Sequence, residues 1–259
     1  MDLELTGRRA LVTGGSRGIG LAIGRALARE GADVALLARG AEAVERAAAD
    51  VAAESGRRVI GIAADTGDDA SVPAAVARVV EQLGGVDVLV NAAATPNTGA
   101  PLPEDALEAE INVKVRGYLR CARAVAPLMV ASGWGRIINI SGLAARQTGT
   151  VVGSVRNVAV AAMTKNLADE LGPQGINVTV VHPGLTRTEA TPGVVSRLVD
   201  ARGVSPEEAE RGLARNSIRH LVDASEVAWV VAFLASPRSI AITGDAIACG
   251  GGQPGPIFY

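Results

Sequence analysis

Residues 11–20 read LVTGGSRGIG, and this stretch decides the fold. It continues a short apolar run, residues 8–14, into an Ala/Arg-rich amphipathic stretch, residues 19–30. Its glycines have the spacing G-x-x-x-G-x-G. Glycines at a strand-to-helix turn permit a tight backbone path, and the free N–H groups at the start of the helix can bind an anionic pyrophosphate. The stretch therefore predicts a strand, a phosphate-binding turn and a helix.

The same alternation of short apolar runs and longer amphipathic stretches continues along the chain. The apolar runs predict strands at residues 8–14, 32–39, 57–65, 86–93, 135–141 and 176–184. The stretches between them predict helices at residues 19–30, 41–55, 70–83, 104–131 and 158–171. Runs that are hydrophobic on both faces suit parallel strands covered by helices on each side. We therefore predict an α/β fold: one doubly wound parallel sheet of about seven strands, with helices on both faces.

No linker or repeat divides the chain, so residues 1–259 are predicted to form a single domain. Residues 189–223 interrupt the alternation, because they are polar and contain no strand-like run. Ligands of open α/β sheets bind beyond the carboxyl ends of the strands, and an insertion after the strand at 176–184 would overhang that edge. We predict that residues 189–223 form a helical substrate lid. A surface helical hairpin without a ligand role is the alternative.

Composition excludes several classes of partner. The net charge of −2 and the pI near 5.8 argue against a nucleic-acid surface, and 2% aromatic residues are too few for base stacking. Two cysteines and two histidines complete no metal-ligand spacing, so no metal is expected. The first fifteen residues carry acids where a signal peptide carries positive charge, and no apolar run approaches the roughly 18–20 residues of a membrane span. A cytoplasmic protein with no membrane or nucleic-acid partner is expected.

Further motifs accompany the glycine-rich turn in a characteristic order. They are LVNAAA at residues 89–94, Asn112, GRIINIS at 135–141, HPGLTRT at 182–188 and ITGDAIACGGG at 242–252. With TGGSRGIG at 13–20, this order and spacing resembles the short-chain dehydrogenase/reductase family along essentially the full chain. The resemblance implies a Rossmann-type domain that binds NAD(H) or NADP(H), takes a small-molecule substrate with a carbonyl or hydroxyl group, and forms a homodimer or homotetramer.

Position by position, the resemblance also implies a cofactor site. The implied cofactor-binding residues are Gly14, Ser16, Arg17, Gly18, Ile19 and Gly20 at the pyrophosphate, Asp65 and Thr66 near the adenine, Asn91, and Pro183, Gly184, Thr186 and Thr188 beside the nicotinamide. Asn91 matches the first residue of the family's N-N-A-G motif. The second and last residues of that motif are Ala92 and Ala94 here, which predicts an altered turn.

The charge at the end of the second predicted strand bears on cofactor choice. An acid there would bind a ribose 2′-hydroxyl and repel a 2′-phosphate. The strand ends at Ala38 and Arg39 with no acid, and Arg39 and Arg17 could pair with a dianionic phosphate. We therefore predict that NADP(H) is preferred over NAD(H). The alternative is that both arginines are merely solvated.

The resemblance fails at the positions that carry the chemistry of the family. Family members use a serine, a tyrosine and a lysine four residues after the tyrosine, which lowers the pKa of the phenol. Neither Tyr118 nor Tyr259 is followed by lysine at that spacing. Aligning the family-like stretch TKNLADEL at 164–171 places Gly153 at the tyrosine position and Asn157 at the lysine position. Gly142 takes the serine position, so the serine is absent or displaced to Ser141.

The remaining polar residues near these positions are the candidate catalytic residues: Ser141, Asn112, Asn157 and His182. Ser141 would donate a hydrogen bond to a substrate oxygen. Asn112 matches a helix asparagine of the family's proton relay, and Asn157 could bond a ribose hydroxyl. His182 has a suitable unperturbed pKa, although a histidine at a strand end before Pro-Gly is more often a wall of the cofactor site.

Three functions remain open from the sequence. The first is an NADP(H)-dependent oxidoreductase of a carbonyl or hydroxyl compound that uses a non-standard proton donor. The second is a non-redox enzyme on the same scaffold, such as a dehydratase, lyase or cyclase. The third is a non-catalytic NADP(H)-binding protein. The glycine-rich turn favours dinucleotide binding in all three.

Overall fold

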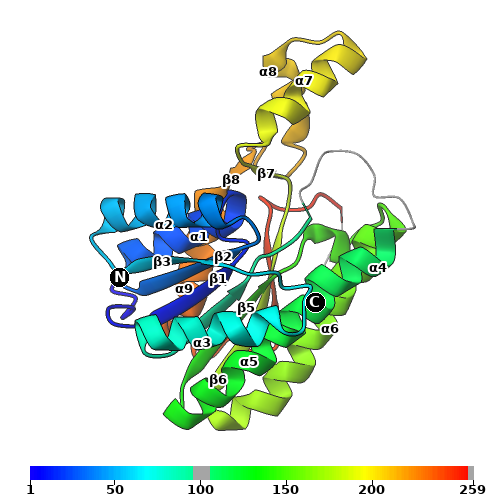
Figure 1. The fold of residues 1–259 in the computed structure, drawn as a ribbon. Helices are drawn as coiled ribbons and strands as arrows, with labels where there is room; N and C mark the ends of the chain where they lie inside the picture. Colours follow the sequence, from blue (N-terminus) through cyan, green and yellow to red (C-terminus); the bar gives the residue numbers. More distant parts are fainter. Residues whose placement is uncertain (96–105, 256–259) are drawn as a thin grey trace.

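The computed structural model describes residues 1–95 and 106–255, and its centre is one parallel sheet (Figure 1). The sheet has the strand order β3-β2-β1-β4-β5-β6-β9. The strands are β1 (Arg9–Thr13), β2 (Asp33–Ala38), β3 (Val59–Ala63), β4 (Val88–Asn91), β5 (Gly135–Ile140), β6 (Ile176–Pro183) and β9 (Ala246–Cys249). All pairings in this sheet are parallel. The order reverses between β1 and β4, which is where α/β sheets bind ligands.

Helices cover both faces of the sheet and bury two apolar layers. One face carries α1 (Gly18–Arg29), α2 (Ala41–Ser55) and α9 (Ala224–Ala235). The other carries α3 (Ser71–Leu83), α5 (Gly117–Ser132) and α6 (Val151–Leu171). Buried side chains of α3 recur at Val72, Val76, Val79 and Leu83, the spacing of one helix face. The predicted α/β sheet with helices on both faces is confirmed.

The predicted helix at 104–131 is not one regular helix. Residues 96–105 lie outside the described residues. A short α4 (Leu107–Glu110) passes through a π-helical turn, η2 (Ile111–Arg116), into α5. A π turn inserts an extra residue into the helix and so rotates the side chains within it, and such turns are frequent at functional sites. The periodicity of apolar residues alone does not reveal this turn.

The longest helix, α6, begins seven residues before the predicted start at 158, because a hydroxyl caps it. The side chain of Thr150 accepts a hydrogen bond from the backbone N–H of Gly153 at 3.1 Å. Such a cap satisfies one of the unpaired N–H groups of the first turn. Among the described residues, no helix combines the length and the apolar composition that crossing a bilayer requires.

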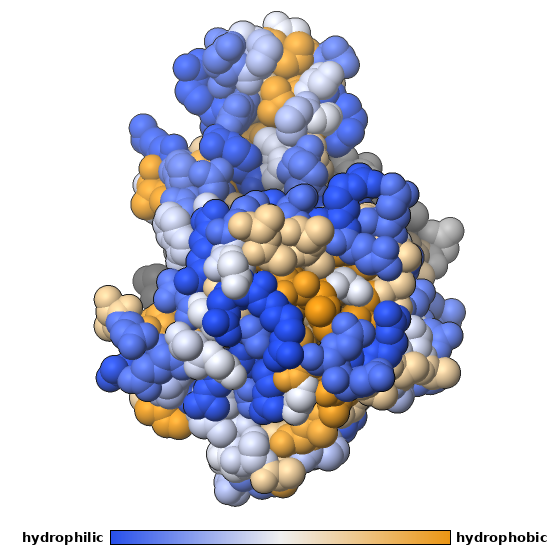
Figure 2. Space-filling view, turned by 60° about the vertical axis from the view of Figure 1, so that its left-hand side comes forward, coloured by the Kyte–Doolittle hydropathy of each residue, from blue (hydrophilic) through white to orange (hydrophobic). Residues whose placement is uncertain are grey.

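Residues 189–223 form two helices, α7 (Thr191–Arg202) and α8 (Pro206–Leu213), which project beyond the edge of the sheet (Figure 1). The projecting segment is largely hydrophilic on the face shown in Figure 2, as its polar sequence indicates. A pair of two-residue strands, β7 (Thr186–Arg187) and β8 (Val222–Asp223), closes its base. Strand β8 could not be predicted from the sequence, because two residues carry no periodicity.

Candidate functional site

A cavity of about 1210 Å³ opens at the carboxyl edge of the sheet. It runs from the turn between β1 and α1 to the ends of β5 and β6. Most of the predicted site residues line it: Gly14, Ser16, Arg17, Gly18, Ile19, Gly20, Arg39, Asp65, Thr66, Ser141, Asn157, Pro183, Gly184, Thr186 and Thr188. The structure thus brings residues from six separate loops and helices to one surface.

The glycines of the first turn are needed because backbone segments meet there. Gly14 has φ +67°, and a Cβ atom on it would lie 2.8 Å from the carbonyl oxygen of Ala92. A Cβ atom on Gly20 would collide with the carbonyl of Gly14. The hydroxyl of Thr13 accepts hydrogen bonds from the N–H groups of Ala92 and Ala93 at 3.0 and 3.1 Å, which fixes the turn after β4. The floor of the cavity is therefore bare backbone.

The first turn of α1 already binds an anionic oxygen. The backbone N–H of Gly18 donates a hydrogen bond to the carboxylate of Glu189 at 3.1 Å. Free N–H groups and the helix dipole make such an N-terminus a site for phosphate or carboxylate. The bare glycine turn and this bound carboxylate both fit the pyrophosphate of a dinucleotide.

The end of the cavity near β2 carries two exposed arginines. Arg17 follows the glycine turn, and Arg39 follows β2; both line the cavity. Within residues 1–95 and 106–255, neither side chain has a hydrogen-bond or ion-pair partner. Asp65 lies beside them, but its carboxylate accepts a hydrogen bond from the N–H of Gly67 at 2.8 Å and shapes the loop after β3. The positive charge of the two arginines is therefore available to a ligand.

Beyond β5, Ser141 and Asn157 lie against each other. The Ser141 hydroxyl is shared between the backbone oxygen of Asn157 at 3.0 Å and its side-chain oxygen at 3.1 Å. The amide nitrogen of Asn157 donates to the backbone oxygen of Gly153 at 2.8 Å. A Cβ atom on Gly142 would lie 3.5 Å from that amide nitrogen, an ordinary contact. The positions that align with the family's serine and lysine thus face each other across the cavity wall.

The same wall contains a charged group that was not predicted from the sequence. Lys114, from the π turn η2, lines the cavity although only 4% of its surface is exposed. Its Nζ donates a hydrogen bond to the backbone oxygen of Ser141 at 2.9 Å. Burial, and then the positive charge of Arg156, lowers the pKa of Lys114 to about 7, whereas Glu110 acts in the opposite direction. The sequence signal that could have revealed this buried lysine is its position between two apolar residues, Val113 and Val115.

Arg156 and Glu110 form the remainder of this charged group. The Arg156 guanidinium lines the cavity and pairs with the carboxylate of Glu110, whose side chain is only 3% exposed. Glu110 thereby neutralises Arg156, and no carboxylate bonds directly to Lys114 among the described residues.

Three predicted site residues lie outside the cavity lining. Asn91 is buried in the sheet and donates to the side-chain oxygen of Asn139 at 2.9 Å. The side chain of Asn112 donates to Gly67 at 3.0 Å and accepts from Arg120 at 3.0 Å, so it holds the loop after β3. His182 is buried in β6 with 1% exposure.

The environment of His182 opposes a role as a proton donor. Burial, together with the positive charges of Arg146 and Lys114, lowers the pKa of His182 to about 4. The ring is therefore neutral at pH 7, and it is separated from the cavity. Tyr118 is also fully buried, with its hydroxyl donating to the backbone oxygen of Ile140 at 3.0 Å, and burial raises its pKa. Tyr259 lies outside the described residues.

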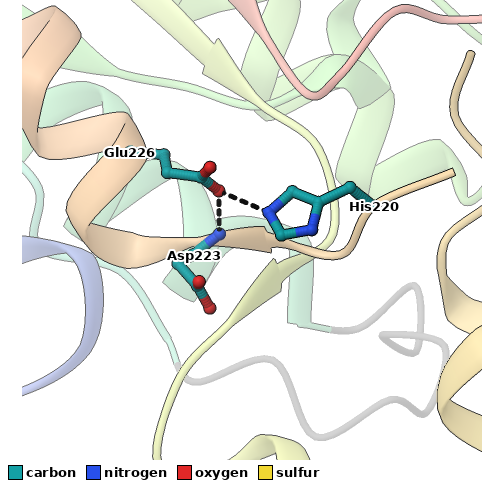
Figure 3. Close-up of side chains that lie close together, drawn as sticks. All are labelled: His220, Asp223 and Glu226. Carbon is teal, nitrogen blue, oxygen red and sulfur yellow. Dashed lines mark hydrogen bonds and ion pairs between the residues drawn. The ribbon is translucent and has the colours of Figure 1, made fainter. Parts of the chain in front are cut away.

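One cluster of potential metal ligands occurs among the described residues, at the base of the projecting segment (Figure 3). It contains His220, Asp223 and Glu226. One carboxylate oxygen of Glu226 accepts from the backbone N–H of Asp223 at 2.7 Å and contacts Nε2 of His220 at 2.8 Å. Arg187 donates to the carboxylate of Asp223 at 3.2 Å. The contact of Glu226 with the Asp223 N–H is part of a capping box at the start of α9, and the cluster has a structural explanation without an ion.

Comparison with known proteins agrees with this geometry. The sequence profile of the family described as short chain dehydrogenase matches residues 8–198. The chain belongs to the short-chain dehydrogenase family. The protein named oxidoreductase UcpA from Escherichia coli strain K12 is 34% identical, with 98% of this chain and 97% of that protein covered. A putative ketoacyl reductase from Streptomyces coelicolor is 38% identical, with 93% and 95% covered.

A solved structure that contains a bound cofactor is similar to this chain in fold. L-sorbose reductase from Gluconobacter frateurii, complexed with NADPH and L-sorbose, superposes with a TM-score of 0.93 at 29% identity. The superposition covers 99% of this chain and 100% of that chain. Membership in this oxidoreductase family confirms the family resemblance and a fold that binds nicotinamide cofactors.

Proposed function

We propose that this short-chain dehydrogenase is an NADP(H)-dependent oxidoreductase of a small molecule with a carbonyl or hydroxyl group, and that its proton donor is not the family's Tyr-x-x-x-Lys pair. The observation that carries the proposal is the continuous cavity from the glycine turn at α1 to the Ser141–Asn157 pair. It joins a phosphate-binding end to an end with hydrogen-bonding groups. When bound there, a nicotinamide dinucleotide supplies or accepts the hydride.

The chain's own residues have distinct tasks in this proposal. The first turn of α1 binds the pyrophosphate once Glu189 has left it. Pro183, Gly184 and Thr186 form the wall beside the nicotinamide, where the Thr186 hydroxyl donates to the oxygen of Gly184 at 3.1 Å. Asn157 orients the Ser141 hydroxyl, which is the group placed to meet a substrate oxygen.

The preference for NADP(H) rests on charge. Arg39 and Arg17 line the cavity, their side chains have no partner among the described residues, and β2 ends without an acid. A guanidinium pairs with a phosphate through two parallel hydrogen bonds, whereas an acid at this point would repel it. L-sorbose reductase was solved with NADPH, which is consistent with this preference.

We also propose that the protein forms a homodimer or homotetramer and lies in the cytoplasm, as expected from the sequence. Val151, Val155 and Val158 are exposed at the i, i+4 and i+7 positions of α6 and form one apolar stripe. Closed symmetric dimers and tetramers are the common assemblies of soluble proteins. A second copy of this chain is the occupant we propose for that stripe.

The test of function separates binding from turnover. The protein is titrated with NADPH by fluorescence and then assayed for NADPH consumption with L-sorbose, a β-ketoacyl thioester and simple ketones. Consumption with at least one carbonyl compound is the expected result. Turnover without any change in NADPH absorbance would indicate a non-redox enzyme. Binding without turnover of any compound would indicate a non-catalytic protein.

A further inference from the structure

We propose that Lys114 is the proton-exchanging residue of this site: its Nζ, held in the cavity wall by the backbone oxygen of Ser141, gives a proton to the substrate's carbonyl oxygen. The inference rests on the proposed oxidoreductase function and names the group that this function lacks. The first observation is the position of the side chain: Lys114 lines the cavity, and its Nζ bonds to the backbone oxygen of Ser141, the residue that pairs with Asn157 after β5.

The burial of Lys114 is the second observation. A charged ammonium loses most of its hydration in such a place, and buried lysines are rare unless they are paired. Lys114 has one hydrogen bond, to a neutral carbonyl, and no directly bonded carboxylate among the described residues. The other lysine of the chain, Lys165, lies at an exposed position and pairs with Asp169 at 2.6 Å. Burial of the Lys114 ammonium therefore lowers the stability of the folded protein, and no bonded carboxylate among the described residues offsets this loss.

Charges from several elements face the Lys114 ammonium. Arg156, from α6, disfavours its protonated form, and Glu110, from α4, favours it. His182, from β6, has a pKa lowered to about 4, first by burial and then by Arg146 and Lys114, so it adds no charge at neutral pH. The pair of Arg156 and Glu110 is neutral overall. The remaining effect is burial, which brings the pKa of Lys114 to about 7, where an amine can both give and take a proton.

The chemical step balances with this assignment. Reduction of a ketone adds a hydride to carbon and a proton to oxygen. The hydride is the contribution of the nicotinamide cofactor, which is oxidised as the ketone is reduced. The N–H bond of the Lys114 ammonium breaks, an O–H bond forms on the product alcohol, and a neutral amine remains. That amine takes a proton from water before the next turnover, and alcohol oxidation uses the same steps in reverse.

This assignment fixes the direction of the pH dependence. Ketone reduction needs the ammonium form, so kcat/KM for reduction falls as the pH rises above about 7. Alcohol oxidation needs the neutral amine, so its kcat/KM rises over the same range. Lys114→Arg keeps a positive charge that cannot be given up, because a guanidinium stays protonated. Its residual rate should therefore lose this dependence.

The first experiment needs no variant of Lys114. The full-length protein is produced with ¹³C-labelled lysine and saturated with NADP⁺. It then shows only two lysine Cε signals, because the chain has two lysines. Lys165→Arg removes one signal and assigns the other. We expect Lys114 to titrate near pH 7. Titration near the unperturbed lysine pKa of about 10.4 would overturn the proposal.

The second experiment measures turnover of a ketone found in the panel above. Lys114→Met and Lys114→Arg should reduce kcat by about 10²–10⁴-fold while NADPH affinity changes less than about threefold. Lys114→Ala should be rescued at least tenfold by added methylamine or ethylamine, which a purely structural role does not explain. Lys165→Met is the matched control and should keep full activity.

The outcomes separate the two proposals. A Lys114→Met enzyme that binds NADPH and keeps the wild-type rate and pH profile would overturn the role of Lys114 and leave the proposed function intact. A wild-type protein that binds NADPH but reduces no carbonyl compound would overturn the proposed function, and this assignment with it.

Discussion

The carboxylate of Glu189 accepts a hydrogen bond from the backbone N–H of Gly18 at 3.1 Å, at the first residue of α1. This N–H is one of the groups that we assign to the pyrophosphate of a bound dinucleotide. Glu189 is also the first residue of the projecting segment 189–223, which contains α7 and α8. Cofactor binding and this contact are therefore mutually exclusive, so a dinucleotide must displace the carboxylate.

Glu189→Gln should therefore tighten NADPH binding. The change removes a negative charge that competes for, and repels, the pyrophosphate. A charge near a helix N-terminus contributes about 0.3–1 kcal/mol, so the Kd should fall about two- to fivefold. Fluorescence titration measures it. Glu207→Gln, on the exposed first turn of α8, is the control and should leave the Kd unchanged. An unchanged or weaker Kd for Glu189→Gln would contradict the competition.

Arg39→Ala should remove most of the preference for NADPH over NADH. A charge-assisted contact to a 2′-phosphate contributes about 1.5–3 kcal/mol, which corresponds to about 10–150-fold in the ratio of the two Kd values. The comparison is between Kd values for both cofactors in wild type and variant. Arg46→Ala removes an exposed arginine of α2 that pairs with Glu42 and serves as the control. Equal affinity of the wild type for both cofactors would refute the preference.

Lys114→Met should stabilise the protein, and the gain should shrink as the pH rises. The folded pKa of Lys114, about 7, lies below that of the unfolded chain, so the folded state binds fewer protons between about pH 7 and 10.4. The cost of burying this lysine is thus complete below pH 7, up to about 5 kcal/mol, and declines toward pH 10.4. Urea unfolding of both proteins at pH 6.5 and 9.5 measures the difference.

The control for this measurement is Lys165→Met. It breaks an exposed pair with Asp169 and should change the free energy of unfolding by no more than about 1 kcal/mol. A stability gain for Lys114→Met that is the same at both pH values would show that Lys114 keeps an ordinary pKa.

Val155→Glu should shift the protein toward the monomer. The change places a charge in the middle of the exposed valine stripe of α6, where the proposed partner copy would leave it without water. Light scattering should give a multiple of the 26.2 kDa chain mass for the wild type and a mass nearer 26.2 kDa for the variant. Ala49→Glu, on the exposed side of α2, adds the same charge elsewhere and should not change the mass. A monomeric wild type at micromolar concentration would refute the interface.

The sheet and the glycine turn could be predicted because their signals are local. Each strand is a short apolar run, and Gly14 and Gly20 are required by backbone contacts that any turn of this shape makes. The start of α6 could not be placed, since it depends on the hydroxyl of Thr150 and not on apolar periodicity. The inward position of Lys114 follows from a π turn and from the nearby ends of β5 and α6, which are distant in sequence.

The polar site residues also divide into those whose position the sequence predicts and those whose position it does not. Ser141 and Asn157 lie together as their motif positions suggest, because motif spacing reports on strand ends. Asn112 and Asn91 form structural hydrogen bonds that only tertiary packing determines. His182 fits a motif position at the cavity edge, yet the pleat of β6 turns it into the interior, and a one-residue change of face is invisible without the pairing register.

The cap of α6 limits how this scaffold can be re-engineered. A Cβ atom at Gly153 would lie 2.8 Å from the Thr150 hydroxyl that begins the helix. A tyrosine introduced at Gly153 must displace that hydroxyl. Gly153→Tyr with Asn157→Lys would therefore add a phenol but remove the cap at the start of the longest helix. Residues 142–157 therefore have to be treated as one segment in any redesign. Giving this chain the chemistry of a relative requires replacing that whole segment, including the residue that caps its helix, instead of substituting single side chains.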